Sequence, residues 1–414
     1  MAAVGLTLAL LGSACGSGDD GGGASVDDGT TTTAVPSART LRVPADHPTI
    51  QSAVDAAEPG DLVLVDRGTY RETVTVETPR LTIRGVDRNE VLIDGELVRE
   101  NGIKVFSDGV AVENLTLHHH AANGVLFTGD YASDRPLVGF RISHVTAYAN
   151  GLYGIYAFGA TGGLIEQTHT AGHPDAGIYV GQCFPCDIVV SDSVAEANAA
   201  GFQGTNAGGD LYVVSSTFRG NRVGIESISS TKERAYPQRS ATFVANRVTA
   251  NDGVGAPRAT DVFGVGIAIG GGRANRVARN VVGGHPTAGI VVSPKESFLP
   301  EANRVEANEL DANAVDLVYL SEDGSPLANC FAANRFTTSD PPDIEQALSC
   351  TPSATGDDAG GSGSLVLGPP PPDVDWRTFP APPAQPSMPD PDGPPRAVTG
   401  APELDLDALA VPAP

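Results

Sequence analysis

One type of segment recurs along this chain with a period near 23 residues. Each copy opens with glycine and an apolar residue, and the copies begin at Gly124, Gly154, Gly177, Gly201, Gly224, Gly266 and Gly289. The steps between these glycines are 30, 23, 24, 23, 42 and 23, so two intervals carry insertions. A second strand-like segment precedes each glycine, with no helical pattern between them. Two or three short strands per repeat are typical of the coils of a parallel β-helix.

The repeat predicts which side chains face inward. The residue after each glycine is apolar and should point into the interior: Val125, Ile155, Ile178, Phe202, Ile225, Ile267 and Ile290. Because side chains alternate along a strand, the next residue should point outward. That outer column contains Leu126, Tyr156, Tyr179, Gln203, Glu226, Ala268 and Val291.

A third column lies three or four residues before the glycine in most repeats; an insertion separates Asn251 from Gly266, and Asn313 lies in the coil after Gly289. It contains His120, Asn150, His173, Asn198, Asn221, Asn251, His285 and Asn313. Stacked asparagines satisfy the backbone groups of a turn through their side-chain amides. We interpret the three histidines as substitutes for asparagine in this turn.

The first repeats are preceded by the run HPTIQSAVDAAEPGDLVLVDRGTYRE. Its spacing predicts a short amphipathic helix that begins after Thr49 as N-cap and covers the open end of the solenoid. The run resembles the opening of pectin-lyase-like proteins, among them pectin methylesterases and alginate epimerases. The resemblance covers Thr40–Cys350 in style and implies an all-β fold, a right-handed parallel β-helix of about ten coils.

The resemblance does not extend to the motifs of known activities. The chain has no DPHD of the mannuronan epimerases, to which His173-Pro174-Asp175 is only loosely similar, and no GHG or RIK of polygalacturonases. It looks most similar to uncharacterised actinobacterial-type β-helix lipoproteins, whose function the resemblance does not supply.

The N-terminal segment resembles a bacterial lipoprotein signal. An apolar run is followed by Gly12-Ser13-Ala14-Cys15, which predicts cleavage before Cys15 and acylation of that cysteine. Two features depart from the pattern, because Gly12 stands where leucine is expected and Arg39 is the first basic residue. An ordinary export signal with a chance cysteine is the alternative.

These signals divide the chain into four parts. Residues 1–15 are the predicted signal, 16–38 a flexible tether, 39–350 the parallel β-helix, and 351–414 a Pro/Asp-rich tail. We expect the tail to be largely disordered or extended, with Trp376 and Phe379 as residues that could dock back. The expected location is outside the cell, anchored to the membrane only through the lipid on Cys15.

Charge and cysteine usage limit the partners. The 50 acidic and 26 basic residues give a net charge of −24, which excludes sequence-independent nucleic-acid binding. Apart from Cys15, the four cysteines predict two local disulfides, Cys183–Cys186 and Cys330–Cys350. A redox role for the first pair is the less favoured alternative, because that chemistry usually needs a helix N-terminus.

The outer column carries the candidate site. Tyr156 and Tyr179 would form a platform for sugar rings, with Gln203 and Glu226 as hydrogen-bonding partners. The insertions Gly129–Pro136 and Ser229–Arg239 crowd the same side, and insertions on one face of a solenoid commonly form its binding face. The remaining predicted contacts with the glycan are Gln182, Asn206, Lys232 and Arg239. The clustered basic residues of the second insertion would admit an acidic sugar locally.

A catalytic use of this face stays open. A lyase or C5-epimerase needs a base near a sugar C5 proton and a positive group to stabilise the developing charge. Tyr179 or His173 could be the base, Arg234 or Arg239 the stabiliser, and Asp175 or Glu226 an acid or ligand. Hydrolysis ranks lower, because Asp175 and Glu226 lie two coils apart and a pair of carboxylates should be closer.

No cofactor is expected, although the sequence leaves Ca²⁺ open. His118-His119-His120 suggests metal binding, but neighbouring side chains should diverge and His120 belongs to the turn column, so we expect no metal there. Two function classes remain for this predicted monomer: a surface protein that binds or modifies a cell-wall or other polysaccharide, and a non-catalytic structural or adhesion rod.

The lipoprotein prediction can be checked directly. Mass spectrometry of the mature N-terminus should find diacylglycerol on Cys15, because the small residues before it form the cleavage site. An unmodified N-terminus at another position would exclude the lipid anchor.

Overall fold

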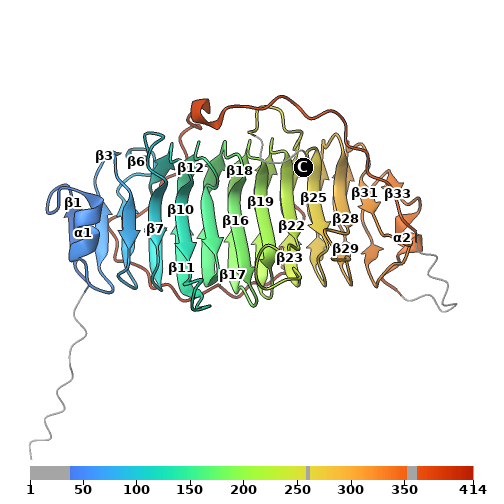
Figure 1. Cartoon of the computed structure of the whole chain (residues 1–414), viewed down its shortest axis with the longest axis horizontal. Helices are drawn as coiled ribbons and strands as arrows, with labels where there is room; N and C mark the ends of the chain where they lie inside the picture. Colours follow the sequence, from blue (N-terminus) through green and yellow to red (C-terminus); the bar gives the residue numbers. More distant parts are fainter. Residues whose placement is uncertain (1–37, 258–261, 352–360, 414) are drawn as a thin grey trace, which may run out of the picture. The chain divides into compact units, whose positions relative to one another are not determined.

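The structure is a computed structural model that describes residues 38–257, 262–351 and 361–413. The predicted signal and almost all of the predicted tether lie outside these residues. The described part is a right-handed parallel β-helix whose strands form three parallel sheets, one per side of each coil (Figure 1). The predicted fold is confirmed. No helix among the described residues is long and apolar enough to span a membrane.

We call the three sheets A, B and C, and give their strands in chain order. Sheet A comprises β1 (Thr40–Val43), β2 (Leu62–Val65), β5 (Thr82–Gly85), β8 (Val110–Glu113), β11 (Leu137–Ser143), β14 (Ala160–Glu166), β17 (Ile188–Ser191), β20 (Leu211–Val214), β23 (Ala241–Val244), β26 (Arg276–Ala278), β29 (Arg304–Glu306) and β32 (Cys330–Ala332). Sheet B comprises β3 (Gly68–Tyr70), β6 (Val91–Asp94), β9 (Thr116–His118), β12 (Thr146–Tyr148), β15 (His169–Ala171), β18 (Val194–Glu196), β21 (Thr217–Arg219), β24 (Arg247–Thr249), β27 (Val281–Gly283) and β30 (Glu309–Asp311). Sheet C comprises β4 (Val74–Val76), β7 (Asn101–Val105), β10 (Asn123–Thr128), β13 (Ile155–Phe158), β16 (Ala176–Cys183), β19 (Ala200–Ala207), β22 (Val223–Ile228), β25 (Val265–Gly270), β28 (Ala288–Ser293), β31 (Leu317–Tyr319) and β33 (Ser339–Asp340).

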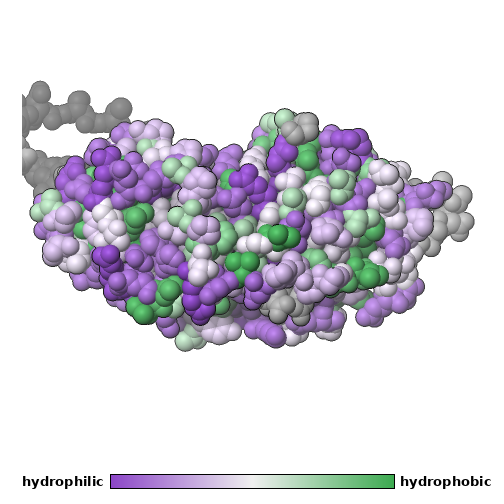
Figure 2. All heavy atoms as spheres, turned by 90° about the horizontal axis from the view of Figure 1, so that it is seen from above, coloured by the Kyte–Doolittle hydropathy of each residue, from purple (hydrophilic) through white to green (hydrophobic). Residues whose placement is uncertain are grey.

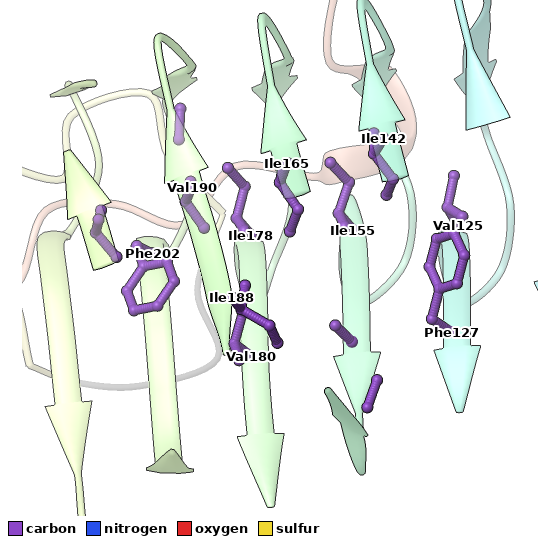
Figure 3. Packing of buried hydrophobic residues seen from close by; sticks show 14 of the residues in the cluster. Val125, Phe127, Ile142, Ile155, Ile165, Ile178, Val180, Ile188, Val190 and Phe202 are labelled. Atoms are coloured by element: carbon purple, nitrogen blue, oxygen red, sulfur yellow. The ribbon is translucent and has the colours of Figure 1, made fainter. Parts of the chain in front are cut away.

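The interior is filled by one continuous column of apolar side chains from all three sheets. The predicted inward residues are buried, from Val125 through Phe202 to Ile290. In Figure 3 the side chains of Ile155 and Ile178 lie beside those of Ile142 and Ile165, which come from sheet A. The alternation predicted from the repeat is therefore confirmed, and it leaves the intervening residues for the outer surface.

Short helices cover the two ends of this column. Helix α1 (Ile50–Ala56) begins at the predicted N-cap Thr49, whose hydroxyl accepts a hydrogen bond from the Ser52 amide. Its residues Ile50 and Val54 join the core. At the other end, α2 (Ile344–Ala347) contributes Ile344 to the same core.

The predicted turn column forms a ladder of hydrogen bonds between sheets B and C. The backbone amide of Asn198 donates to the side-chain Oδ1 of Asn221 at 2.9 Å, and the backbone amide of Asn221 donates to Oδ1 of Asn251 at 3.0 Å. The amide of Asn251 donates in turn to the ring Nδ1 of His285 at 3.2 Å. Histidine thus replaces asparagine as the acceptor, as predicted.

Two further asparagine ladders, which were not predicted from the sequence, lie at the other two corners of the coils. Asn246, Asn280, Asn308 and Asn334 stack between sheets A and B, each amide donating to the next Oδ1. Asn275, Asn303 and Asn329 stack at the corner that precedes sheet A. These corners satisfy buried turn amides by the same means.

The C-terminal tail was expected to be disordered or extended, and its described part has the extended form. Residues 361–413, here called the strap, are mostly extended, apart from the short 3₁₀-helix Trp376–Thr378, and they run back over the coils (Figure 1). Asn114 Oδ1 accepts from the Ser387 hydroxyl and the Met388 amide. Leucines of the strap pack on apolar residues of sheet A: Leu404, Leu406 and Leu409 on Val189, Val214 and Val244. An extended proline-rich chain has no internal hydrogen bonds, so its carbonyls are free to accept from the β-helix.

Arginines supply several of those donors. Glu113 is fully buried on sheet A between Arg84 and Arg141, with nitrogen–oxygen distances of 2.7 and 2.5 Å. Both guanidinium groups also donate to strap carbonyls, Arg84 to Gly393 at 2.6 Å and Arg141 to Arg396 at 3.0 Å. The strap is thus fastened by both charged and apolar contacts.

Seen from above, the surface of the molecule has apolar residues interspersed with hydrophilic ones (Figure 2).

The turn ladder predicts a large cost for losing one member. Asn221→Ala should lower the free energy of unfolding by about 3 kcal/mol, because the buried Asn198 amide and Ala195 carbonyl lose their partners. Urea denaturation measures this cost. The control Asn89→Ala, at an exposed position where the side chain bonds only to groups that water can also reach, should cost clearly less. Equal stability of the two variants would contradict a supporting role for the ladder.

Candidate functional site

The outer column of sheet C has the predicted register. Tyr156 pairs with Tyr179, Tyr179 with Gln203, and Gln203 with Glu226, each on the neighbouring strand. These strands are β13, β16, β19 and β22, which lie on the viewer's side in Figure 1. The column therefore brings together residues that are 23 or 24 positions apart in the chain.

Tyr179 is nevertheless not exposed, which corrects the predicted platform. Its side chain is 1% exposed, because the insertion Ser229–Arg239, here called the covering loop, folds over it. The phenol hydroxyl lies 2.7 Å from both carboxylate oxygens of Glu233. The register of Tyr179 was predicted correctly, whereas the path of the covering loop was not. Because its side chain is buried, Tyr179 cannot reach a polymer to act as a base.

The covering loop is held by residues that were predicted to bind substrate. Asn206 is buried and donates to the carbonyls of Ser230 and Glu233 at 2.7 and 3.1 Å. Gln182 Oε1 accepts from the Arg234 amide at 3.1 Å. Asn206 therefore positions the loop instead of contacting a ligand, and Gln182 is also engaged by it.

A strip of aromatic rings borders the covered tyrosine. Tyr153 stacks on Tyr156 with centroids 4.4 Å apart and planes within 6°. Tyr156 stacks on Phe158 at 5.3 Å, and Phe158 stacks on Tyr131 at 6.0 Å. These four residues, here called the aromatic strip, are half-buried or exposed. Of them only Tyr156 was predicted from the outer column. Phe158 lies two residues further along the same strand, and Tyr131 and Tyr153 lie outside the column.

The strip leads into a pocket of about 480 Å³. Its walls come from the insertion Gly129–Pro136, the end of β13 and the loop closed by the disulfide Cys183–Cys186. That disulfide and Cys330–Cys350 are both present as predicted. The first pair closes a tight loop beside the pocket, which favours its structural role.

Three carboxyl groups gather at the other end of the strip. Glu226 accepts a hydrogen bond from Gln203 at 3.0 Å, and Asp175 interacts electrostatically with both Glu226 and Glu233. Burial raises the pKa of Asp175 and that of Glu233, and the neighbouring negative charges raise both further. Hydrogen bonds from Tyr153 and Tyr179 oppose these two rises. A carboxyl group of raised pKa can hold a proton and donate it, as a general acid does.

The two arginines of the covering loop have structural partners, whereas its lysine is exposed. Arg234 forms an ion pair with Asp134 at 2.5 Å and lies 3.9 Å over the ring of Tyr131. Arg239 donates to two carbonyls of its own loop and lies over the ring of Phe184. Lys232 is exposed. Neither arginine is placed as the predicted stabiliser of negative charge beside the carboxyl cluster.

His173 also departs from its predicted catalytic role. It is fully buried in the turn ladder, with Nδ1 2.8 Å from Asn198 Oδ1 and Nε2 3.1 Å from Asn150 Nδ2. Burial lowers its pKa to about 4, so the ring is neutral at physiological pH. A histidine enclosed in this way cannot reach a substrate.

Comparison with known proteins agrees with this architecture. A family model described as "Right handed beta helix region" matches residues 80–236. This description agrees with the right-handed parallel β-helix of the structure, over rather less than half of the chain. A search of curated proteins found no match.

Solved structures resemble this β-helix protein at low sequence identity. The A-module of the mannuronan C-5 epimerase AlgE4 from Azotobacter vinelandii is 14% identical with a TM-score of 0.48, covering 70% of this chain and 91% of that one. Pectate lyase Pel9A is 14% identical with a TM-score of 0.47, covering 78% and 83%. An alginate lyase from Paenibacillus sp. is 13% identical with a TM-score of 0.39, covering 73% and 97%. The likeness concerns the fold alone.

The raised pKa of Glu233 predicts a pH-dependent stability. A carboxyl group that binds its proton more tightly when folded stabilises the fold at acidic pH, and this contribution is lost as the pH rises through the folded pKa. Glu233→Gln keeps an acceptor for Tyr179 without the charge, so its melting temperature should exceed that of the parent at pH 7. The difference should disappear near pH 3, where the carboxyl group is protonated in the unfolded state as well as in the folded one.

Glu77→Gln, at an exposed position, measures the general effect of removing one negative charge. If both variants shift the melting temperature equally at every pH, the buried environment of Glu233 has no special role.

Proposed function

We propose that the aromatic strip and the adjoining carboxyl cluster bind a linear polysaccharide along the outer face of sheet C. The observation that carries the proposal is the run of stacked rings from Tyr153 through Tyr156 and Phe158 to Tyr131. The partly exposed parts of these stacked rings form a continuous apolar strip along which successive sugar units can lie, while the carboxyl and amide groups beside it bind hydroxyl groups.

The proposed polysaccharide is uncharged. Asp175, Glu226 and Glu233 are acidic, and the chain as a whole carries a net charge of −24. Arg234 and Arg239 are engaged by other groups, so they do not offset the acidic cluster. A polyuronate would be repelled there, and this replaces the acidic sugar considered from the sequence.

The carboxyl cluster favours a second function at the same site, general acid–base catalysis on the bound chain. Asp175 is half-buried with a raised pKa, so it can hold a proton near a glycosidic oxygen. Glu226 lies within electrostatic reach of it and can serve as the base that takes a proton from the attacking water molecule. On an uncharged chain this reaction is hydrolysis, which ranked lower from the sequence because the two residues lie two coils apart. Export, membrane anchoring through Cys15 and the monomeric state stay parts of the proposal, as does the expectation of no cofactor, with Ca²⁺ left open. The two disulfides favour an oxidising location.

Binding can be tested on an array of neutral and acidic glycans. The double variant Tyr156→Ala, Phe158→Ala should bind the preferred neutral glycan about tenfold more weakly or worse, because two stacking surfaces are lost. The control Tyr212→Ala, which removes a half-buried tyrosine on sheet A, should bind like the parent.

Retention of full affinity by the double variant would refute the strip as the binding surface, and exclusive binding of polyuronates would refute the neutral ligand. Product analysis after incubation tests the second function. Asp175→Asn should bind as the parent does and release no product.

A further inference from the structure

The other candidate site lies on sheet B, away from the aromatic strip. Its strands β6, β9 and β12 place Asp94, His118 and Tyr148 in one column, since Asp94 and Tyr148 each pair with His118. His119 follows immediately in the chain. Ligand atoms of Asp94, His118 and His119 all lie within 4.8 Å of one another.

The two neighbouring imidazoles converge, contrary to the expectation from the sequence. His119 has a positive φ of 55°, so the chain turns there and swings its ring toward that of His118. The two Nδ1 atoms are 2.8 Å apart, and Asp94 Oδ1 is 3.7 Å from His118 Nδ1. The backbone of this turn is held by hydrogen bonds from His119 to Ala149 and from Leu97 to His119.

The surroundings support the orientation of these groups. Tyr148 stacks on the ring of His118 with centroids 4.9 Å apart and planes within 14°. Asp94 Oδ1 accepts from the Glu96 amide at 2.9 Å, which fixes the carboxylate toward the histidines. The side chains of Asp94 and His118 are 20% and 10% exposed, so the cluster borders solvent without being spread over the surface.

We propose that Asp94, His118 and His119 form a binding site for a transition-metal ion of the Zn²⁺ class. Two imidazole nitrogens and one carboxylate oxygen are the donors such an ion prefers, whereas Ca²⁺ and Mg²⁺ prefer oxygen alone. Two nitrogens bound to one tetrahedral ion are about 3.3 Å apart. A small rotation of the half-buried His119 ring would lengthen the Nδ1–Nδ1 distance from 2.8 Å to this value. Water completes the fourth position.

The alternative is a hydrogen bond between two neutral rings, one of which carries its proton on Nδ1. The hydrogen bond accounts for the 2.8 Å separation as it stands, whereas the metal requires the rotation of the His119 ring. The two arrangements therefore differ in whether a metal binds there. The experiment uses the full chain without a polyhistidine tag, stripped with EDTA and titrated with ZnCl₂ in a calorimeter. The parent should bind one equivalent, and CoCl₂ should give the visible absorption bands of tetrahedral cobalt with nitrogen and oxygen donors.

Two variants remove ligands with little disturbance. His119→Asn tolerates the positive φ, and Asp94→Asn keeps the oxygen that accepts from Glu96. Each should weaken Zn²⁺ binding at least about tenfold. His144→Asn is the matched control, because His144 also has positive φ and lies outside the cluster; it should bind as the parent does.

Melting in EDTA shows whether each variant is folded, and a folded Asp94→Asn decides the matter if His119→Asn does not fold. A parent that binds neither Zn²⁺ nor Co²⁺ overturns the proposal without reference to any variant. So does Zn²⁺ binding that neither substitution weakens, or Ca²⁺ that displaces Zn²⁺ from the site.

Discussion

The corners of the coils impose the constraint on which this structure depends. Each coil must turn three times, and each turn brings backbone amides to the border of an apolar interior, where an unpaired amide is costly. Asparagine solves this by accepting from the preceding coil and passing its own amide to the next, as Asn198, Asn221 and Asn251 do. The same side chains fix the vertical register of the coils. The position of a residue along the axis of the β-helix therefore follows from how many residues separate it, along the chain, from the nearest ladder asparagine.

That register explains how a site can be assembled from distant positions. Strands of neighbouring coils are about 4.8 Å apart, so equivalent residues become vertical neighbours on the surface. Gln203 and Glu226 meet in this way on sheet C, and Asp94 and Tyr148 flank His118 on sheet B. Insertions then add what the columns lack. The covering loop brings Glu233 to Tyr179, and a single turn with positive φ brings His119 to His118.

Much of the fold could be predicted from the sequence, because period-2 alternation and the repeat depend on local pattern alone. Ile178 and Phe202 were predicted inward and are buried, and both disulfides were predicted from short spacing. What failed depends on paths that have no periodicity. Tyr179 has an outward register, yet the covering loop buries it, and no pattern in residues 229–239 indicates where that loop lies. His173 was correctly placed in the turn column, and its burial there follows from the neighbouring coils.

The strap has a consequence for how the molecule can come apart. In a solenoid each repeat contacts only its neighbours, so the stack can fray or open one unit at a time. The strap contacts Arg84 near one end, Arg141 further along and Val244 well beyond them, which joins coils that share no interface of their own. Opening a single coil then also disturbs contacts made elsewhere along the strap. The strap therefore couples distant coils in addition to the contacts between neighbouring coils. The unfolding of the stack should accordingly be closer to that of a single cooperative unit.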